Sequence, residues 1–163
     1  MIQGADAPAS YYRDIHELYV RTWIKHMGQG LRPFLNEVFF QLLEQQFRHR
    51  SSFSVASRSV ERMGMALFYH KADSIYGRYW GCFEEIPFLH FTTCYYHPID
   101  YAIQKGIGIM DPGFGGEHKL IRGYEVAPVY HYIKFYGERQ RKIADQIMQR
   151  VGFLPVPRET SGR

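Results

Sequence analysis

The chain has 163 residues, of which 45% are hydrophobic and 22% are charged. This length and balance predict one globular domain with a substantial core and exclude a low-complexity chain. The net charge of +4 is compatible with an anionic partner, but the chain has no uninterrupted block of Lys and Arg of the kind that marks nucleic-acid-binding segments.

The opening residues and the cysteines indicate a cytoplasmic protein. Residues 1–6 lack the basic and apolar regions of a signal peptide. The sequence also contains no run of about 18 apolar residues, which is the length needed for a membrane span. Two cysteines, Cys82 and Cys94, do not make a disulfide framework. Both lie in aromatic, apolar stretches, which favours buried reduced thiols over a nucleophile.

The first third of the chain is predicted to be helical. Residues 1–10 are expected to be a flexible lead-in to a single domain over 11–151, which a tail at 152–163 follows. Apolar residues recur every three or four positions from Tyr12, which predicts a helix that ends near Met27. Pro33 is expected to open a second helix through residue 47, with Asn36 as an alternative cap.

The period then changes to that of strands. Three strands are predicted near residues 53–57, 63–69 and 75–81, with a turn at 71–74. A helix over 90–105 follows, although Pro98 allows a start near residue 97 instead. A strand at 107–110, a helical turn at 116–121, a strand at 126–135 and a helix at 138–151 complete the order. Hairpin strands followed by a strand–helix–strand crossover predict an α/β (α+β) fold with one mixed, mostly antiparallel sheet and helices on both faces.

The segment from Gly113 to Tyr124 has the densest charge chemistry in the chain. It places Glu117, His118, Lys119 and Arg122 between glycines, just past a predicted strand. Lys119 and Arg122 are suited to an oxyanion or an anionic substrate, and Glu117 or His118 could accept a proton. We therefore predict these four as catalytic residues. A structural ion pair between Glu117 and Arg122 is the alternative interpretation.

A substrate cleft is predicted beside this segment. The alternation of the third strand places Tyr76, Arg78 and Trp80 on one face, where a cation between aromatic rings is either a ligand clamp or a stacked structural residue. No His or Cys spacing matches a metal site, so no metal is expected. The expected substrate-binding residues are Tyr76, Arg78, Trp80, Glu84, His90, Tyr95 and Gly116.

Three blocks of sequence resemble the FemAB-like family of bacterial proteins, which is related to peptidoglycan biosynthesis and to the GNAT acyltransferases. The blocks are Tyr76–Cys82 (YGRYWGC), Phe88–Tyr96 (FLHFTTCYY) and Gly116–Tyr124 (GEHKLIRGY). The match extends from about residue 12 to residue 136. The resemblance implies a GNAT-like fold and an acyltransferase or aminoacyltransferase that forms an amide bond on an amine acceptor, such as a peptidoglycan precursor peptide.

The resemblance also bears on the donor and on partners. GNAT enzymes that use acetyl-CoA carry a glycine-rich phosphate loop at the start of the helix after the fourth strand, where backbone N–H groups hold the anion. Residues 88–99 contain no glycine, and the nearest match, Lys25–Gly30, follows a helix. CoA is therefore not expected, no cofactor is predicted, and a tRNA-borne aminoacyl ester is the donor that the resemblance implies.

Family members have two GNAT-like halves, and this chain is similar to the second. The resemblance therefore implies either a homo-oligomer or a missing N-terminal half. Two other functions stay open, namely a non-catalytic GNAT-like binding module and an acetyl-CoA-dependent N-acetyltransferase.

Overall fold

The computed structural model describes residues 1–130 and 134–150. The chain divides into two compact units, Met1–Gly123 and Tyr124–Arg163. The sequence places residues 11–151 in one domain, whereas this division begins a new unit at Tyr124. No helix within the described ranges is long and apolar enough to cross a membrane.

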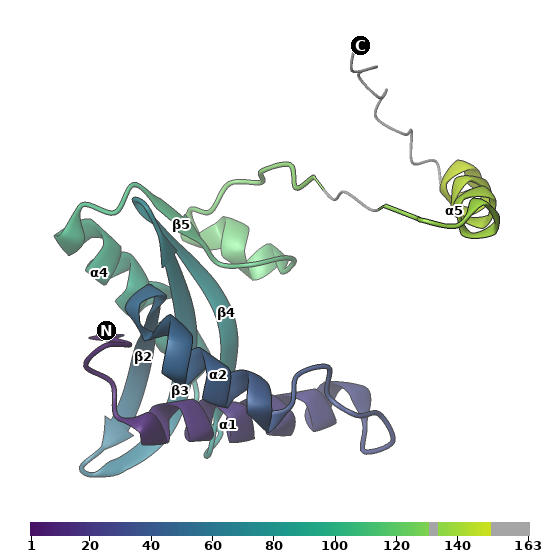
Figure 1. Ribbon diagram of the computed structural model, residues 1–163. Helices are drawn as coiled ribbons and strands as arrows, with labels where there is room; N and C mark the ends of the chain where they lie inside the picture. Colours follow the sequence, from purple (N-terminus) through teal and green to yellow (C-terminus); the bar gives the residue numbers. More distant parts are fainter. Residues whose placement is uncertain (131–133, 151–163) are drawn as a thin grey trace. The chain divides into compact units, whose positions relative to one another are not determined.

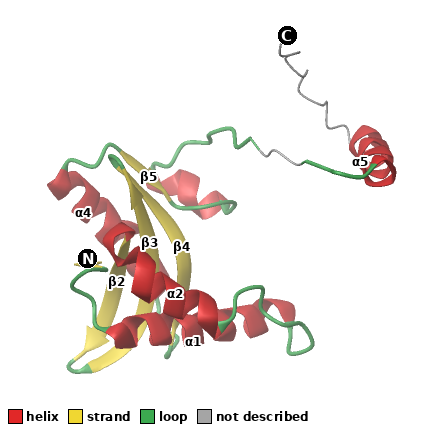
Figure 2. Cartoon of the chain, viewed as in Figure 1, coloured by secondary structure: helices red, strands yellow, loops and turns green. Residues whose placement is uncertain are grey.

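The first unit is built on a five-stranded sheet in the order β1-β2-β3-β4-β5 (Figures 1 and 2). The strands are β1 (Ile2–Gln3), β2 (Ser51–Arg58), β3 (Glu61–Lys71), β4 (Ser74–Cys82) and β5 (Ile109–Asp111). The first four strands pair antiparallel, and β5 lies parallel to β4 after a helical crossover. This arrangement confirms the predicted mixed, mostly antiparallel sheet.

Two helices cover one face of the sheet. Helix α1 (Ala9–Met27) buries Tyr12, Ile15 and Leu18, and ends where Gly28 takes a φ of 81° and donates its N–H to the Ile24 carbonyl. Helix α2 (Glu37–Phe47) begins at Asn36, whose side chain accepts a hydrogen bond from the Phe39 N–H at 3.1 Å. The prediction that Pro33 opens this helix is therefore wrong, and the side-chain cap sets its start.

The core on this face is apolar and aromatic. Tyr12 packs edge-to-face against Phe53 of β2, with ring centroids 5.0 Å apart. The buried members of the cluster come from α1, α2 and the two central strands: Ala7, Tyr12, Ile15, Leu18, Phe40, Leu43, Phe53, Met65 and Leu67. Ala7 is buried and Ile2–Gln3 pairs with β2, so residues 1–10 are part of the folded unit and not a flexible lead-in.

A continuous helical run covers the other face. It consists of α3 (Leu89–Phe91), the π-helical turn η2 (Thr92–Tyr96) and α4 (His97–Lys105). The run confirms the helix predicted over 90–105 and not the later start. Pro98 lacks a backbone donor, and the wider π-helical turn directly before α4 accommodates that missing bond. Gly106 ends α4 with a φ of 66° and leads the chain back to β5.

The remaining elements follow β5. A short 3₁₀ helix, η3 (Glu117–Arg122), ends the first unit. In the second unit, α5 (Glu138–Arg150) forms close to its predicted position. Residues 124–130 and 134–137 contain no strand, so the strand predicted at 126–135 is absent from its described part. Residues 131–133 of that strand and the predicted tail at 152–163 lie outside the described residues.

Candidate functional site

Strand β5 is much shorter than β4 and pairs only with its first part. They pair only at Ser74–Tyr76 of β4, which lie opposite Ile109–Asp111 of β5. From Gly77 to Cys82, the edge of β4 that faces β5 has no strand partner within the described part of the chain. An unpaired strand edge presents N–H and C=O groups that an extended ligand can bind.

A cavity of about 490 Å³ lies at this unpaired edge. The end of α1, the middle of β3 and β4, the helical run and the loop after β5 all contribute to its wall. The aromatic and titratable residues that line it are Tyr19, Trp23, His26, Phe68, Arg78, Tyr79, Trp80, His90, Cys94, Tyr95 and Phe114. Ligand sites in proteins are typically concave, mostly apolar and furnished with a few convergent polar groups, as here.

A β-bulge at Arg78 changes which residues of β4 lie on each face of the sheet. Leu67 of β3 pairs with Tyr79 while the next residue, Phe68, pairs with Gly77, which leaves Arg78 as the extra residue. Trp80 therefore faces the helical run, whereas Tyr76, opposite Tyr69, faces α1 and α2. The predicted grouping of Tyr76 with Arg78 and Trp80 on one face is wrong, because the extra residue reverses the alternation.

Arg78 itself remains at the cavity. Its side chain is exposed, and its guanidinium carbon lies 5.1 Å from the centre of the Tyr79 ring. Burial raises the pKa of Tyr79, and the positive charge of Arg78 partly opposes this rise. Arg78 thus stays available to an anionic group of a ligand at the cavity wall.

His90 is a titratable group within the cavity's aromatic wall. Its ring centre lies 5.1 Å from that of Trp80 and 5.4 Å from that of Tyr95. Burial lowers the pKa of His90, and the nearby cations Arg122 and Lys119 lower it further. A histidine kept neutral near pH 7 can accept a proton from a substrate.

His118 lies behind this wall and not on it. Its Nε2 is 3.0 Å from the Tyr95 hydroxyl, so the two side chains share a hydrogen bond beside the cavity. The backbone at Gly116, with a φ of 92°, comes so close that an added Cβ would lie 2.5 Å from the His118 ring. Gly116 therefore acts through His118 and not by lining the cavity, which differs from its predicted contact with substrate.

Lys119 is held inside its own loop. Only 9% of its surface is exposed, and its ammonium donates to the carbonyls of Gly113 at 2.9 Å and Phe114 at 3.2 Å. Burial lowers the pKa of Lys119, while the Asp111 carboxylate opposes this shift. Because Gly113 and Phe114 line the cavity, the Lys119 ammonium stabilises one part of its wall.

Arg122 has a comparable supporting position. Its Nη1 donates to the His118 carbonyl at 2.5 Å, and its guanidinium carbon lies 3.9 Å above the centre of the Phe91 ring. Glu117 is exposed, and the alternative ion pair between it and Arg122 is not formed in the described structure. The four predicted catalytic residues thus lie next to the cavity, and none belongs to its lining.

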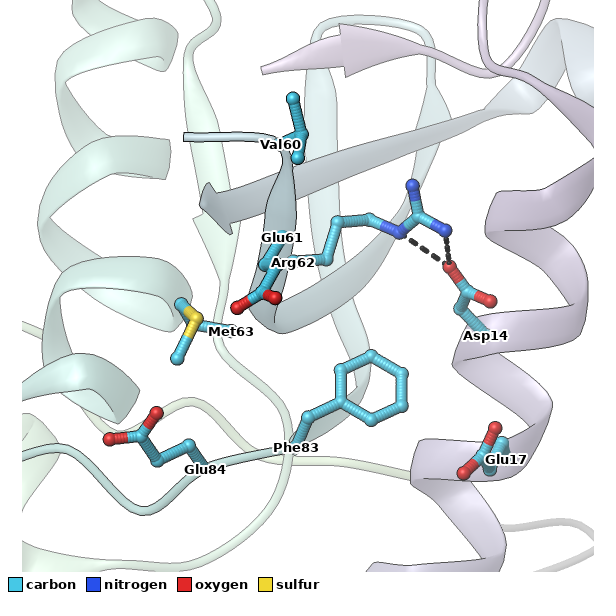
Figure 3. Close-up of a pocket in the computed structure, with 8 residues that line it drawn as sticks. All are labelled: Asp14, Glu17, Val60, Glu61, Arg62, Met63, Phe83 and Glu84. Carbon is cyan, nitrogen blue, oxygen red and sulfur yellow. Dashed lines mark hydrogen bonds and ion pairs between the residues drawn. The ribbon is translucent and has the colours of Figure 1, made fainter. Parts of the chain in front are cut away.

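Glu84 lies elsewhere, in a second hollow between the β2–β3 hairpin and α1 (Figure 3). There Glu84 and Glu17 stand on opposite sides of Phe83, and Arg62 reaches across to Asp14. Glu84 is paired with Arg58 at 3.5 Å, and Glu17 with Arg21 at 2.6 Å. The structure does not bring Glu84 to the cavity that His90 and Tyr95 line.

The cysteines are unsuited to nucleophilic roles. Burial raises the pKa of the Cys94 thiol, and the pKa of Cys82 is raised by burial and by the Glu85 carboxylate. A thiol with a raised pKa is largely protonated near pH 7 and reacts slowly. Among the described residues, no three His, Cys, Asp or Glu side chains are grouped so that they could hold a metal ion.

Sequence reasoning missed the contribution of α1 to the cavity. Tyr19, Trp23 and His26 line it, and the Thr22 hydroxyl donates to the Trp80 carbonyl at 3.1 Å. The helical period of α1 predicts which face is apolar but not that its last turns lie beside the unpaired edge of β4. No motif in the sequence marks these residues.

The sequence profile of the FemAB-like family, described as peptidoglycan biosynthesis/recognition, matches residues 1–152. The chain belongs to the FemAB-like family. This match confirms the resemblance that the three sequence blocks carry. None of the curated proteins matches the chain.

Solved structures identify the fold of this FemAB-like chain. A protein described as a "possible acetyltransferase" from Clostridium difficile 630 superposes with a TM-score of 0.57 at 11% identity, over 80% of this chain and 95% of that one. The PaiA N-acetyltransferase of Thermoplasma acidophilum, solved with coenzyme A, gives a TM-score of 0.42 at 11% identity, over 62% and 71%. The first likeness, together with the mixed sheet, shows the GNAT-like fold.

Proposed function

We propose that this FemAB-like domain transfers an acyl or aminoacyl group to an amine, in the cavity at the unpaired edge of β4. The acceptor we favour is an amine of a peptidoglycan precursor peptide, in keeping with the description of the family. One observation carries the proposal: His90, whose pKa is lowered by burial, and Tyr95 line one cavity beside an edge of β4 that has no strand partner among the described residues.

The reaction needs only positioning and proton transfer. The amine attacks the carbonyl carbon of the donor, a tetrahedral oxyanion forms, and the new C–N bond replaces the bond to the leaving group. In this proposal His90 takes the proton that the amine loses and returns it to the leaving oxygen or sulfur. Backbone N–H groups on this edge of β4 are suited to bind the donor or its oxyanion, because no strand of the described ranges pairs with them.

The predicted catalytic residues take supporting roles in this mechanism. His118 orients the Tyr95 hydroxyl, Lys119 holds the loop at Gly113 and Phe114, and Arg122 fixes the His118 backbone. The positive charges of Lys119 and Arg122 add to the effect of burial in lowering the pKa of His90, which favours the neutral form that accepts a proton. Glu117, exposed on η3, has no part in this scheme.

We further propose an ester donor, such as aminoacyl-tRNA, in preference to CoA. The helical run after β4 begins at Phe88, which has a left-handed φ of 66° and an exposed ring where phosphate loops have glycine. A second GNAT-like half, on another chain or from a second copy, would add the remaining wall of an otherwise open cavity.

The decisive test is product formation by the purified protein. We would incubate it with a muropeptide acceptor and, separately, aminoacyl-tRNA or acetyl-CoA, and detect the new amide by mass spectrometry. Loss of a general base typically lowers the rate about 10²- to 10⁴-fold, and we expect a loss in this range for His90→Gln. The exposed His49 lies in η1 (Arg48–Arg50), outside the cavity lining, so His49→Gln is the matched control and should keep full activity.

The outcomes separate the candidate functions. Product from acetyl-CoA alone would overturn the donor proposal and keep the site. Saturable thermal stabilisation by a ligand without any product would favour a binding module, since a ligand that binds the native state raises its stability. Equal activity of the His90→Gln and His49→Gln variants would show that His90 is not the base.

A further inference from the structure

The lining of the cavity at the unpaired edge of β4 is free of acidic side chains. Among the described residues, this lining contains one arginine, Arg78, and two histidines, and neither Asp nor Glu. Two carboxylates lie outside the lining and have partners: Asp111 accepts a hydrogen bond from the Gly113 N–H at 2.7 Å, and Glu85 is paired with Lys25. The permanent charge on the described cavity wall is therefore that of Arg78.

Arg78 lies just past the last residue pair of β4 and β5. At that point a Cβ on Gly113, in the loop after β5, would lie 3.5 Å from the Gly77 carbonyl oxygen, so the two backbones are in contact. The next residue on each segment, Arg78 and Phe114, lines the cavity. The Arg78 guanidinium contacts the Tyr79 ring, and no carboxylate of the described ranges forms an ion pair with it.

Phe114 is an exposed ring in a position that a buried cation holds. Its side chain is fully exposed, and the glycines on either side, Gly113 and Gly115, have φ values of 84° and 73°. The buried Lys119 ammonium donates to the carbonyls of Gly113 and Phe114. Burial of a charge is unfavourable unless hydrogen bonds compensate it, and here those bonds fix the loop. The loop thus presents an apolar ring at the cavity, where a ligand can cover it.

We propose that Arg78 and Phe114 select an acceptor that carries a carboxylate: Arg78 binds the carboxylate, and the Phe114 ring covers the adjoining hydrocarbon. This inference rests on the proposed function, because it takes the ligand to be the amine acceptor. The planar guanidinium presents paired donors that match the two oxygens of a carboxylate. Phosphate sites commonly add the N–H groups of a glycine-rich helix start, whereas the helical run here begins at Phe88.

The test is direct binding, measured without the reaction. The two tryptophans of the chain, Trp23 and Trp80, both line the cavity, so intrinsic fluorescence reports its occupancy. We would titrate the unaltered chain with a muropeptide, with the same muropeptide after its carboxylates are converted to amides, and with inorganic phosphate. We expect the acid form to bind about 10- to 100-fold more tightly than the amide form, because the amide loses the charge-assisted hydrogen bonds.

The variants assign this preference to single residues. Arg78→Gln should lower the affinity for the acid form to that for the amide form and leave the latter unchanged, whereas a disturbed fold would lower both. Phe114→Ser should weaken both forms about tenfold, because the covering ring is lost. Arg13 on α1 and Val60 on the β2–β3 hairpin are exposed and outside the lining. Arg13→Gln and Val60→Ser are therefore the controls and should bind as the unaltered chain does, and circular dichroism would confirm that every variant is folded.

The outcomes separate this inference from the proposed function. Equal affinity of the unaltered chain for the acid and amide forms, or absence of binding by the acid form, would overturn the inference. Tighter binding of phosphate than of the acid form would also overturn it and assign Arg78 to a phosphate group. Carboxylate-dependent binding without any amide product would keep the inference and contradict the transfer reaction. Equal rates of product formation from the acid and amide forms would do the reverse.

Discussion

The two faces of the sheet differ in chemistry. The face under α1 and α2 is closed by aromatic and aliphatic side chains, and Phe53, Leu67 and Ile15 have no exposed surface. The face under the helical run has fewer buried apolar residues and several polar ones. On that face the Ser52 hydroxyl forms a hydrogen bond of 2.7 Å with His70 Nε2, and the Ser54 hydroxyl forms one of 2.9 Å with His97 Nδ1.

The two faces therefore have different roles: one contributes most of the apolar burial, and the other carries the candidate site. Apolar burial is the dominant favourable contribution to folding, and it is concentrated under α1 and α2. Polar and titratable groups cost free energy when buried, so they are retained where hydrogen bonds satisfy them. The candidate base His90 and its neighbours Tyr95 and His118 lie on the polar side, at the edge that β5 leaves open.

The largest expected difference between the faces comes from two neighbouring residues of β2. Phe53→Ala should lower the free energy of unfolding by about 3–5 kcal/mol, because it empties a fully buried site. Ser54→Ala, one residue away on the opposite face, should cost about 1 kcal/mol, since it leaves the hydrogen bond to His97 unmade. Urea unfolding followed by circular dichroism measures both, and equal losses would contradict the division of roles.

Two glycines of β4 give a smaller contrast. A Cβ on Gly81 would lie 2.6 Å from the Leu18 Cβ and 2.8 Å from the Leu18 carbonyl oxygen, so Gly81→Ala should cost about 1–3 kcal/mol. At Gly77 the nearest atom would be 3.5 Å away, and Gly77→Ala should change stability by less than about 1 kcal/mol. Thermal unfolding of both variants tests how closely α1 packs on β4, and a stable Gly81→Ala variant would argue against that packing.

The smallest predicted effect is a dependence on pH. Burial lowers the pKa of His70 and of His90 in the folded chain. The unfolded chain therefore binds more protons than the folded chain as the pH falls below about 6.5, and the free energy of unfolding should decrease there. His70→Gln should flatten this acid-side loss in the melting temperature. A loss of the same size in that variant would remove His70 as a cause.

Much of the fold could be predicted because its signals are local. The helical period from Tyr12, the stop at Gly28 and the alternation in the strands each depend on neighbouring residues. The order of the predicted elements along the chain was then enough to predict the mixed sheet. The predicted start of α2 at Pro33 was wrong and the alternative cap at Asn36 is the one formed, because the Phe39 N–H donates a hydrogen bond to the Asn36 side chain.

The candidate site could be predicted in part. Arg78, Trp80, His90 and Tyr95 line one cavity, because the strand and the helical run that carry them follow each other in the chain, and their binding of substrate stays a prediction. Glu84 lies in another hollow. The contribution of Tyr19 and Trp23 depends on α1 lying beside β4, and no local pattern in α1 contains that information.

The sequence by itself therefore determined the elements, the family and the approximate region of the site. Only the tertiary structure decided how individual side chains are used. The bulge at Arg78 arises from pairing with β3, and it turns Tyr76 away from Trp80. Lys119 looks like a free cation in the sequence, yet the returning loop buries its ammonium against two backbone carbonyls. Both outcomes depend on contacts between strands or across a loop, and these form only when the chain is folded.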